Sequence, residues 1–156
     1  MSNISQAYDD IISVIESVLP NHKAIINPYR PELNDDLTFE KGWGLAFADG
    51  INTNLQLGCR LSIDRNFRLI LTRKTFAGQL QRSANAVTVS RDTEKSLFED
   101  HYLVLKEFET NPTITDSQVI TKLVYQGDAG LEFVRTERTD LLILTSQLTL
   151  TYFEEL

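Results

Sequence analysis

The chain has 156 residues, with 22 acidic and 15 basic side chains and a formal net charge of -7. This length fits one domain that can bury about two thirds of its unfolded surface without a metal or a disulfide. The negative charge argues against a protein whose main task is to hold nucleic acid, although a local basic patch is allowed. The single cysteine, Cys59, excludes an internal disulfide and a cysteine-based metal site.

The start of the sequence lacks the basic and apolar segments of a signal peptide. No apolar run approaches the ~18 residues that a membrane helix needs. We therefore expect a soluble protein that is made in the cytoplasm and does not enter a membrane.

Helical spacing predicts an amphipathic helix over residues 4–18. Its apolar positions are Ile4, Tyr8, Ile11, Ile12, Ile15 and Val18. Ser2 or Asn3 can cap its start, and Pro20 ends it. A short strand is expected over residues 24–26.

Residues 27–36 predict an exposed loop, because their prolines, asparagines and aspartates favour turns and leave little to bury. Asp35 and Asp36 stand side by side within it. No third ligand is apparent in the sequence, so we expect solvated carboxylates there instead of a metal site.

Residues 37–48 place apolar and aromatic side chains on one parity, which predicts a strand or a pair of strands broken at Gly42 and Gly44. The two glycines are too few for a dinucleotide-binding fingerprint, since Phe47 stands in the place of the third. Trp43 and Phe47 also resemble the base-stacking aromatics of an RNA-recognition motif, but the register fails. We interpret the segment as a core strand.

Residues 55–63 and 67–76 predict two strands, joined as a hairpin by the polar residues 64–66. Residues 77–90 hold few large apolar side chains and predict a long extended loop. The basic residues in and beside it are Arg73, Lys74, Arg82 and Arg91. They form a basic patch on an acidic protein, which fits a partner-binding arm as well as a plain surface loop.

A second helix is expected over residues 92–110, ended by Asn111 and Pro112. Its apolar face comprises Leu97, Phe98, Tyr102, Leu105 and Phe108, widened by Leu103 and Val104. His101 borders this face. We expect a packed or exposed imidazole there, not a ligand or a base, because the other histidine, His22, is distant in sequence.

Strands at 119–125 and 131–135 flank a glycine-rich turn at 126–130, and a polar loop at 136–140 leads into a long final strand at 141–152. One parity of this last strand carries Leu142, Leu144, Ser146, Leu148, Leu150 and Tyr152. The other carries Thr145, Gln147, Thr149 and Thr151. Because successive side chains of a strand point to opposite faces, the pattern predicts one dry face and one polar face. The length of the strand favours a central place in its sheet.

These elements predict a single α+β (mixed α/β) domain over residues 1–156. We expect one mainly antiparallel sheet covered on one face by two amphipathic helices, with a long extended loop and a polar face left to water or another subunit. No nucleophile elbow, phosphate loop, metal-binding histidine pair or catalytic cysteine with a nearby base is visible in the sequence. We therefore expect no enzyme activity, no catalytic residue, no cofactor and no metal.

Three stretches carry a resemblance to a known family: Leu69-Ile70-Leu71-Thr72-Arg73-Lys74-Thr75-Phe76, Tyr125-x-x-Asp128-x-Gly130-Leu131-Glu132-Phe133 and Leu150-Thr151-Tyr152-Phe153-Glu154. With a short first helix, a long polar connection and an acidic second helix, their order resembles the tail terminator (tail-completion) proteins of long-tailed bacteriophages. The resemblance covers most of the chain from Arg60 onward and, more loosely, the first helix. The Trp43 segment and residues 28–36 have no counterpart in it.

The resemblance implies a structural virion protein at the head-proximal end of the tail. Such proteins form a hexameric ring that stops polymerisation of the tail-tube protein and meets the head-completion (connector) protein. DNA can pass through the ring, and neither a membrane nor sequence-specific nucleic-acid binding is implied. The residues that we expect at the inter-subunit or tube interface are Arg73, Lys74, Phe76, Leu80, Arg82 and Arg91. The alternatives are another head-tail adaptor or minor tail protein, a small RNA-binding domain and a small hydrolase.

Overall fold

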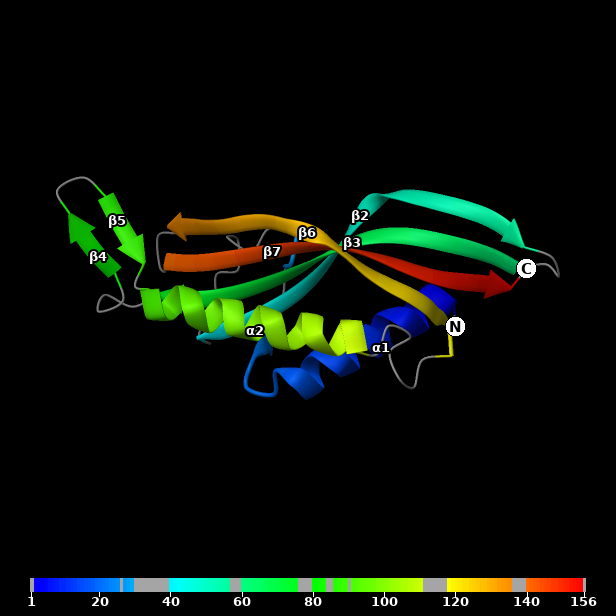
Figure 1. The fold of residues 1–156 in the computed structure, drawn as a ribbon, viewed down its shortest axis with the longest axis horizontal. Coiled ribbons are helices and arrows are strands. Elements are labelled where there is room, and N and C mark those ends of the chain that lie inside the picture. The colour runs from blue at the N-terminus through cyan, green and yellow to red at the C-terminus, as the bar shows by residue number, and fades with distance from the viewer. Residues whose placement is uncertain are drawn as a thin grey trace.

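The computed structural model describes residues 2–25, 27–29, 40–56, 60–75, 80–83, 86–89, 91–110, 118–135 and 140–155. Two helices lie within these ranges, α1 (Asn3–Val18) and α2 (Arg91–Thr110). The strands are β1 (Lys23–Ala24), β2 (Lys41–Gln56), β3 (Arg60–Thr75), β4 (Leu80–Ser83), β5 (Ala86–Val89), β6 (Ile120–Arg135) and β7 (Asp140–Glu155). The predicted α+β class is confirmed (Figure 1).

The main sheet has the strand order β1-β2-β3-β7-β6. β1 pairs with β2 in parallel, and the other pairs of this sheet are antiparallel. β4 and β5 form a separate antiparallel hairpin that stands beyond one end of the sheet in Figure 1. The described part of residues 77–90 is therefore a hairpin and not the predicted long loop. Val87, Thr88 and Val89 favour a strand because they are β-branched, although they supply little apolar bulk.

β7 is an interior strand between β3 and β6, as its length and alternation predict. Its leucine parity is dry: the side chains from Leu142 to Tyr152 on that parity are all buried, Ser146 included. The opposite parity is polar only from Thr145 onward. At the start of β7 it carries Leu141 and Ile143, which are buried in a second, smaller cluster with Ile25, Ala46 and Ile70.

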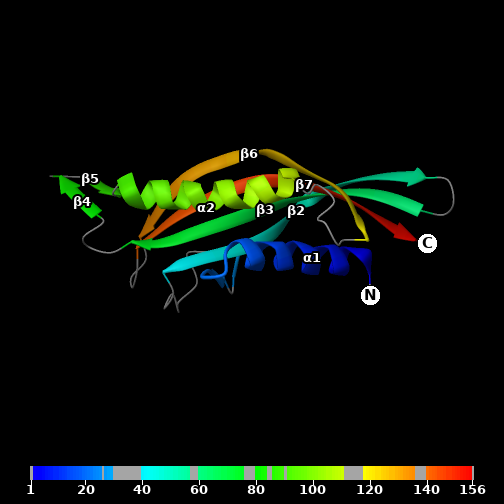
Figure 2. The same cartoon turned by 60° about the horizontal axis from the view of Figure 1, so that its bottom comes forward.

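The main core contains residues of both helices and of the main sheet. Ala7, Ile11 and Ile15 of α1 belong to the same buried cluster as Leu97, Val104 and Phe108 of α2. The cluster also contains Phe67, Leu69 and Leu71 of β3 and the leucine parity of β7. In Figure 2 both helices run along the length of the sheet. Burial at every third or fourth helical position explains why the periodicity located both helices correctly.

The start of α1 is capped from the far end of the chain. The amide side chain of Asn3 donates to the Phe153 carbonyl at 2.5 Å, and the Ile4 amide donates to Glu154 Oε1 at 3.2 Å. Ser2 is the N-cap residue, but its side chain makes no capping hydrogen bond. The carboxylate of Glu154 therefore supplies a capping hydrogen bond that we expect from Ser2 or Asn3. Its negative charge also interacts favourably with the positive end of the helix dipole.

β3 is one continuous strand, so the hairpin turn predicted at residues 64–66 is wrong. β2 and β3 are joined instead at residues 57–59, which lie outside the described part of the chain. Asp64 and Asn66 fall on the polar parity of β3, where they accept hydrogen bonds from Thr151 (2.6 Å) and Thr149 (2.7 Å). A cluster of turn-forming residues can therefore lie within a strand, because a neighbouring strand bonds their side chains.

β6 is also continuous, in place of the turn predicted at residues 126–130. Its pairing with β7 shifts register between Tyr125 and Gly127 and again between Asp128 and Gly130. The two glycines have φ of 130° and 105°. Such values are unfavourable for residues with a side chain, so the glycines place bulges in the strand and do not end it.

β2 passes through both of its first glycines without a break, and its pairing with β3 becomes irregular only between Phe47 and Ile51. A Cβ atom on Gly44 would lie 2.8 Å from the Cβ of Pro28. Gly44 is therefore required by the close approach of the segment that follows β1. The alternative of two strands broken at the glycines is not observed.

The buried face of α2 is turned relative to the predicted one. The buried residues are Thr93, Leu97, His101, Val104 and Phe108. Phe98 and Tyr102, which we had placed on the apolar face, are 45% and 57% exposed, and Leu103 is 44% exposed. The predicted face is wrong because it was placed by apolar residues alone. The helix buries His101 and Thr93 and leaves the rings of Phe98 and Tyr102 exposed.

Candidate interaction surfaces

The predicted basic interface is divided by the structure. Arg91 is exposed at the start of α2, and Lys74 is partly buried near the end of β3. Leu80 and Arg82 belong to β4, so they lie in the hairpin. Phe76 lies outside the described residues. The term hairpin arm is used below for β4 and β5, residues 80–89.

Arg73 points into the molecule and not outward from an arm. It is 2% exposed, and its guanidinium donates a hydrogen bond to Oδ2 of Asp100 on α2. His22 Nε2 contacts the same carboxylate oxygen at 2.8 Å. We had expected Arg73 to meet a neighbouring subunit, but its charge is paired within its own chain. The alternating parity of β3 sets this inward direction, because Arg73 follows Leu69 and Leu71 on the buried face.

The pKa of the Asp100 carboxyl lies below its ordinary value. Burial by itself would raise this pKa, but the hydrogen bond to His22 and the positive charges of Arg73, His22 and Lys41 outweigh it. Asp100 is therefore ionised at neutral pH. Since β3 leads into the hairpin arm and α2 follows it, the Arg73–Asp100 ion pair ties together the two elements from which the arm projects.

A second polar cluster lies beneath α2, where His101 meets β6 and β7. Ser146 Oγ is hydrogen-bonded to His101 Nε2 and donates to Asp128 Oδ1 at 3.2 Å. The Tyr125 hydroxyl donates to the same Asp128 oxygen at 2.5 Å. The two buried polar side chains of this cluster, Ser146 and His101, thus have hydrogen-bond partners, which removes most of the cost of burying them.

This cluster contains a serine, a histidine and an aspartate, but it does not have the geometry of a catalytic triad. A triad uses one ring nitrogen for the serine and the other for the acid. Here the same Nε2 atom of His101 faces both Ser146 and Asp128, the latter at 3.3 Å. Ser146 is fully buried, so its hydroxyl cannot reach a substrate. The arrangement supports a structural role.

Burial lowers the pKa of His101 below 6.5, although the charge of Asp128 acts to raise it. The imidazole is therefore neutral at pH 7. The pKa of Tyr125 is raised to about 12 by burial and by its hydrogen bond to Asp128 and the charge of that carboxylate. The sequence carried a signal for part of this cluster, because Ser146 interrupts the leucine parity of β7. Asp128 was missed, since we had placed it in a turn.

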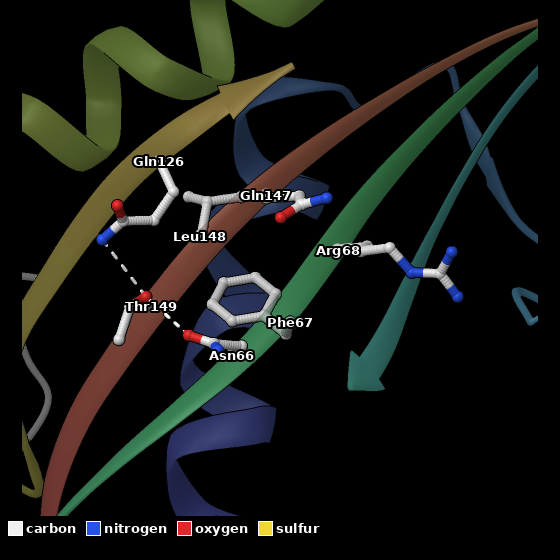
Figure 3. Close-up of a pocket in the computed structure, with 7 residues that line it drawn as sticks. All are labelled: Asn66, Phe67, Arg68, Gln126, Gln147, Leu148 and Thr149. Atoms are coloured by element: carbon white, nitrogen blue, oxygen red, sulfur yellow. Dashed lines mark hydrogen bonds between the residues drawn. The ribbon is translucent and has the colours of Figure 1, made fainter. Parts of the chain in front are cut away.

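The polar half of the sheet carries an open groove of about 540 Å³ on the face away from the core. Its polar lining comes from Asn66, Arg68, Gln126, Gln147 and Thr149 (Figure 3). Gln126 Nε2 donates to Thr149 Oγ1 at 3.3 Å, and Thr149 Oγ1 donates to Asn66 Oδ1 at 2.7 Å. The amide, hydroxyl and guanidinium groups suit hydrogen bonding to a polar segment. The groove is called the sheet groove below.

The sheet groove lies on the threonine face, which the sequence predicts to contact water or another subunit. The sequence does not single out Asn66, which is predicted to lie in a turn. It also gives no signal for Arg68. Among the described residues, the lining also includes the apolar side chains of Phe67 and Leu148.

The aromatic residues proposed for RNA stacking are used in the core. Trp43 is 4% exposed and belongs to the main buried cluster. Phe47 lies between Tyr8 and Phe67, with ring centroids at 5.5 Å and 5.6 Å. Neither ring is presented as a platform for a base, so the RNA-recognition alternative loses the residues on which it depended.

Among the described residues, no group of three or more histidine, cysteine, aspartate or glutamate side chains is arranged to hold a metal ion. Neither of the two described helices has the length and hydropathy to cross a membrane. No protein-family model and no curated protein matches this chain.

Proposed function

We propose that the protein is a tail terminator of a long-tailed bacteriophage. In this proposal six copies form a ring at the head-proximal end of the tail, where the ring stops polymerisation of the tube protein and meets the head-completion protein. The proposal takes up the sequence resemblance from Arg60 onward. The structural feature that supports it most directly is the hairpin arm.

The hairpin arm pairs within itself and stands apart from the main sheet (Figure 1). A hairpin of two four-residue strands is marginal in water when it is isolated, so a surface that accepts it would add to its stability. The strand that precedes the arm, β3, and the helix that follows it, α2, are held together by the buried Arg73–Asp100 ion pair. An arm between two elements that are joined in this way is suited to reaching a neighbouring subunit.

A closed ring needs two different patches on each subunit, because each copy docks one patch onto the other patch of the next copy. The hairpin arm supplies one candidate patch and the sheet groove the other. In the proposed subunit both helices cover the leucine face of the sheet, so the threonine face with its groove stays free for this contact. Gln126, Gln147 and Asn66 would hydrogen-bond to the arm's backbone.

Electrostatics favours the same assignment. Arg82 lies in the arm and Arg91 just after it, on a chain whose net charge is -7. A basic arm on an acidic subunit is attracted to the next acidic subunit, and such pairing sets the register of an assembly more than its affinity. Arg73 has no part in this contact, since it is buried.

The first experiment measures the mass of the purified protein in solution, with and without tail tubes of the phage that encodes it, and images the particles. We expect rings of six, alone or capping tube ends. The arm is tested by the double variant Arg82→Glu with Arg91→Glu, which should lose ring or tube binding while the subunit stays folded.

Arg60→Glu is the matched control, because Arg60 is exposed at the other end of β3 and pairs with Glu155 at 3.1 Å. This variant should still form rings. A wild-type monomer that ignores tubes would contradict the terminator assignment. One or two copies bound at a tail would indicate an adaptor or a minor tail protein instead.

A further inference from the structure

We propose that the outward face of α2 is a self-association surface, on which α2 of a second copy of this chain packs antiparallel. The residues of this face, called the α2 ridge below, are Lys95, Phe98, Glu99, Tyr102, Lys106 and Glu109. The proposal concerns the free protein and does not depend on the tail-terminator assignment.

Most of the large apolar side chains that the described part of the chain leaves exposed belong to α2. There are four of them, Tyr29, Phe98, Tyr102 and Leu103, and the last three lie on α2. Phe98 and Tyr102 belong to the α2 ridge. Phe98 and Tyr102 are four residues apart, so they lie next to each other on one side of the helix. Single exposed aromatics are ordinary, but neighbouring ones on a helix mark a contact surface.

The position of the ridge follows from the core. Leu97, His101 and Val104 face the sheet and fix the rotation of the helix. Residues on the opposite side must then face outward, and Lys95, Glu99, Lys106 and Glu109 are all exposed. The ridge is therefore a continuous strip with Tyr102 near its middle and charged residues towards both ends.

The charges of the ridge select both the partner and its direction. Lys95 and Glu109 lie at equal distances along the helix on either side of Tyr102, with opposite charge. In an antiparallel pair centred on Tyr102, Lys95 of each copy faces Glu109 of the other. A parallel pair would place Lys95 against Lys95 and Glu109 against Glu109, which is repulsive.

The contact between Phe98 and Lys106 agrees with this register. Phe98 and Lys106 also lie at equal distances on either side of Tyr102, so the aliphatic stem of each lysine covers the ring of the other copy and its ammonium group can lie over the ring face. The two Tyr102 rings meet at the two-fold axis. Antiparallel helix dipoles add a small attraction.

One helix face buries less surface than the roughly 1,600 Å² of a standard stable interface. We therefore expect a dimer that forms at high concentration and dissociates on dilution. Its two-fold contact uses the same patch on both copies, whereas a ring uses two different patches. The dimer and the ring can therefore be tested separately.

Cross-linking tests the geometry. In a Cys59→Ser background, Tyr102→Cys should form a disulfide-linked dimer under mild oxidation, because two thiols at the axis come within the ~4 Å between Cβ atoms that a disulfide needs. Glu109→Cys alone should not cross-link, since the two symmetry-related positions are roughly 20 Å apart along the helix. A mixture of Lys95→Cys and Glu109→Cys proteins should cross-link.

Charge reversal tests the pairing. Sedimentation equilibrium should show that Lys95→Glu and Glu109→Lys each weaken dimerisation by about tenfold, because each change creates two repulsive contacts per dimer. The double variant should restore it. Glu16→Lys on α1 is the matched control, because Glu16 is exposed and lies outside the ridge, and it should leave dimerisation unchanged.

Circular dichroism should show that all variants keep the wild-type fold. A wild-type protein that stays monomeric at high concentration would overturn the proposal. Efficient cross-linking of Glu109→Cys with itself would overturn the antiparallel geometry. A dimer that survives both single charge reversals unchanged would show that association uses another surface.

Discussion

Asp100 on α2 receives the side chain of Arg73 from β3 on the same carboxylate oxygen that His22 contacts. The side chains of Arg73 and Asp100 are 3% and 14% exposed. Three segments of the chain, the end of β3, the middle of α2 and the turn after α1, thus meet at one carboxylate. The ion pair joins β3, which precedes the hairpin arm in the chain, to α2, which follows it.

Removing the carboxylate should destabilise the protein strongly. Asp100→Asn leaves the buried Arg73 charge unpaired, so we expect the free energy of unfolding to fall by about 3–5 kcal/mol. Urea denaturation followed by circular dichroism measures this change. Glu99→Gln alters the exposed neighbour on the same helix and should cost less than about 0.5 kcal/mol. Equal losses in the two variants would contradict the role of the ion pair.

The stability of the protein should decrease as the pH falls below the ordinary histidine pKa of 6.5. The pKa of His101 is lower in the folded protein than in the unfolded chain, so the unfolded chain binds more protons between these two values. Stability is complete above pH 6.5 and is lost as the pH falls toward the folded pKa.

The measurement for this effect is the free energy of unfolding at a series of pH values between 7 and 5 for wild type and His101→Gln. The glutamine keeps a donor near Ser146 and Asp128 but cannot be protonated. We expect its pH dependence to be flatter over this range. The same slope in both proteins would exclude His101 as the source.

Completing the leucine parity of β7 should harm the protein. Ser146→Leu looks favourable from the alternating pattern, but it adds bulk in a fully buried position and leaves His101 without its hydroxyl partner. We expect a loss of about 2–4 kcal/mol, and thermal unfolding measures it. Thr145→Val, on the other parity of the same strand, should change stability by less than about 1 kcal/mol. A stabilised Ser146→Leu protein would refute the polar cluster as a structural element.

Gly130→Ala should cost about 1–2 kcal/mol through the backbone alone. At φ of 105° a residue with a Cβ atom is strained, while nothing lies within 4 Å of the position that this atom would occupy. Chemical denaturation with the m-value monitored tests this. An alanine variant as stable as wild type would mean that the bulge can relax.

The periodic elements could be predicted from the sequence because burial follows their period. α1 and the interior strand β7 bury their apolar residues at regular intervals. α2 buries Leu97, Val104 and Phe108 at helical spacing, although Phe98 and Tyr102 are exposed. The hairpin predicted at Asp64 and Asn66 failed because those side chains are bonded by Thr151 and Thr149 across the sheet. Hydrogen bonds between side chains of β3 and β7 cannot be predicted from the local sequence around Asp64 and Asn66.

The candidate interface was predicted less well, because the sequence does not show to which face of the sheet each basic side chain points. Arg73 and Lys74 are adjacent in a strand, so their side chains point to opposite faces, yet a basic pair reads as one patch in the sequence. Only the structure shows that Arg73 faces Asp100. The apolar pattern of α2 also could not show that His101 is buried and Tyr102 exposed. The partners of His101, Ser146 and Asp128, lie on strands that are distant in the sequence.

The bulges of β6 have a consequence for solubility. β6 is one of the two edge strands of the main sheet, and an exposed edge with regularly spaced amide and carbonyl groups can pair with a strand of another molecule. Gly127 and Gly130 interrupt that spacing along one of the longest strands of the molecule. These irregularities make the edge of β6 a poorer template for a strand of another molecule, which lowers the tendency of the protein to aggregate through this edge.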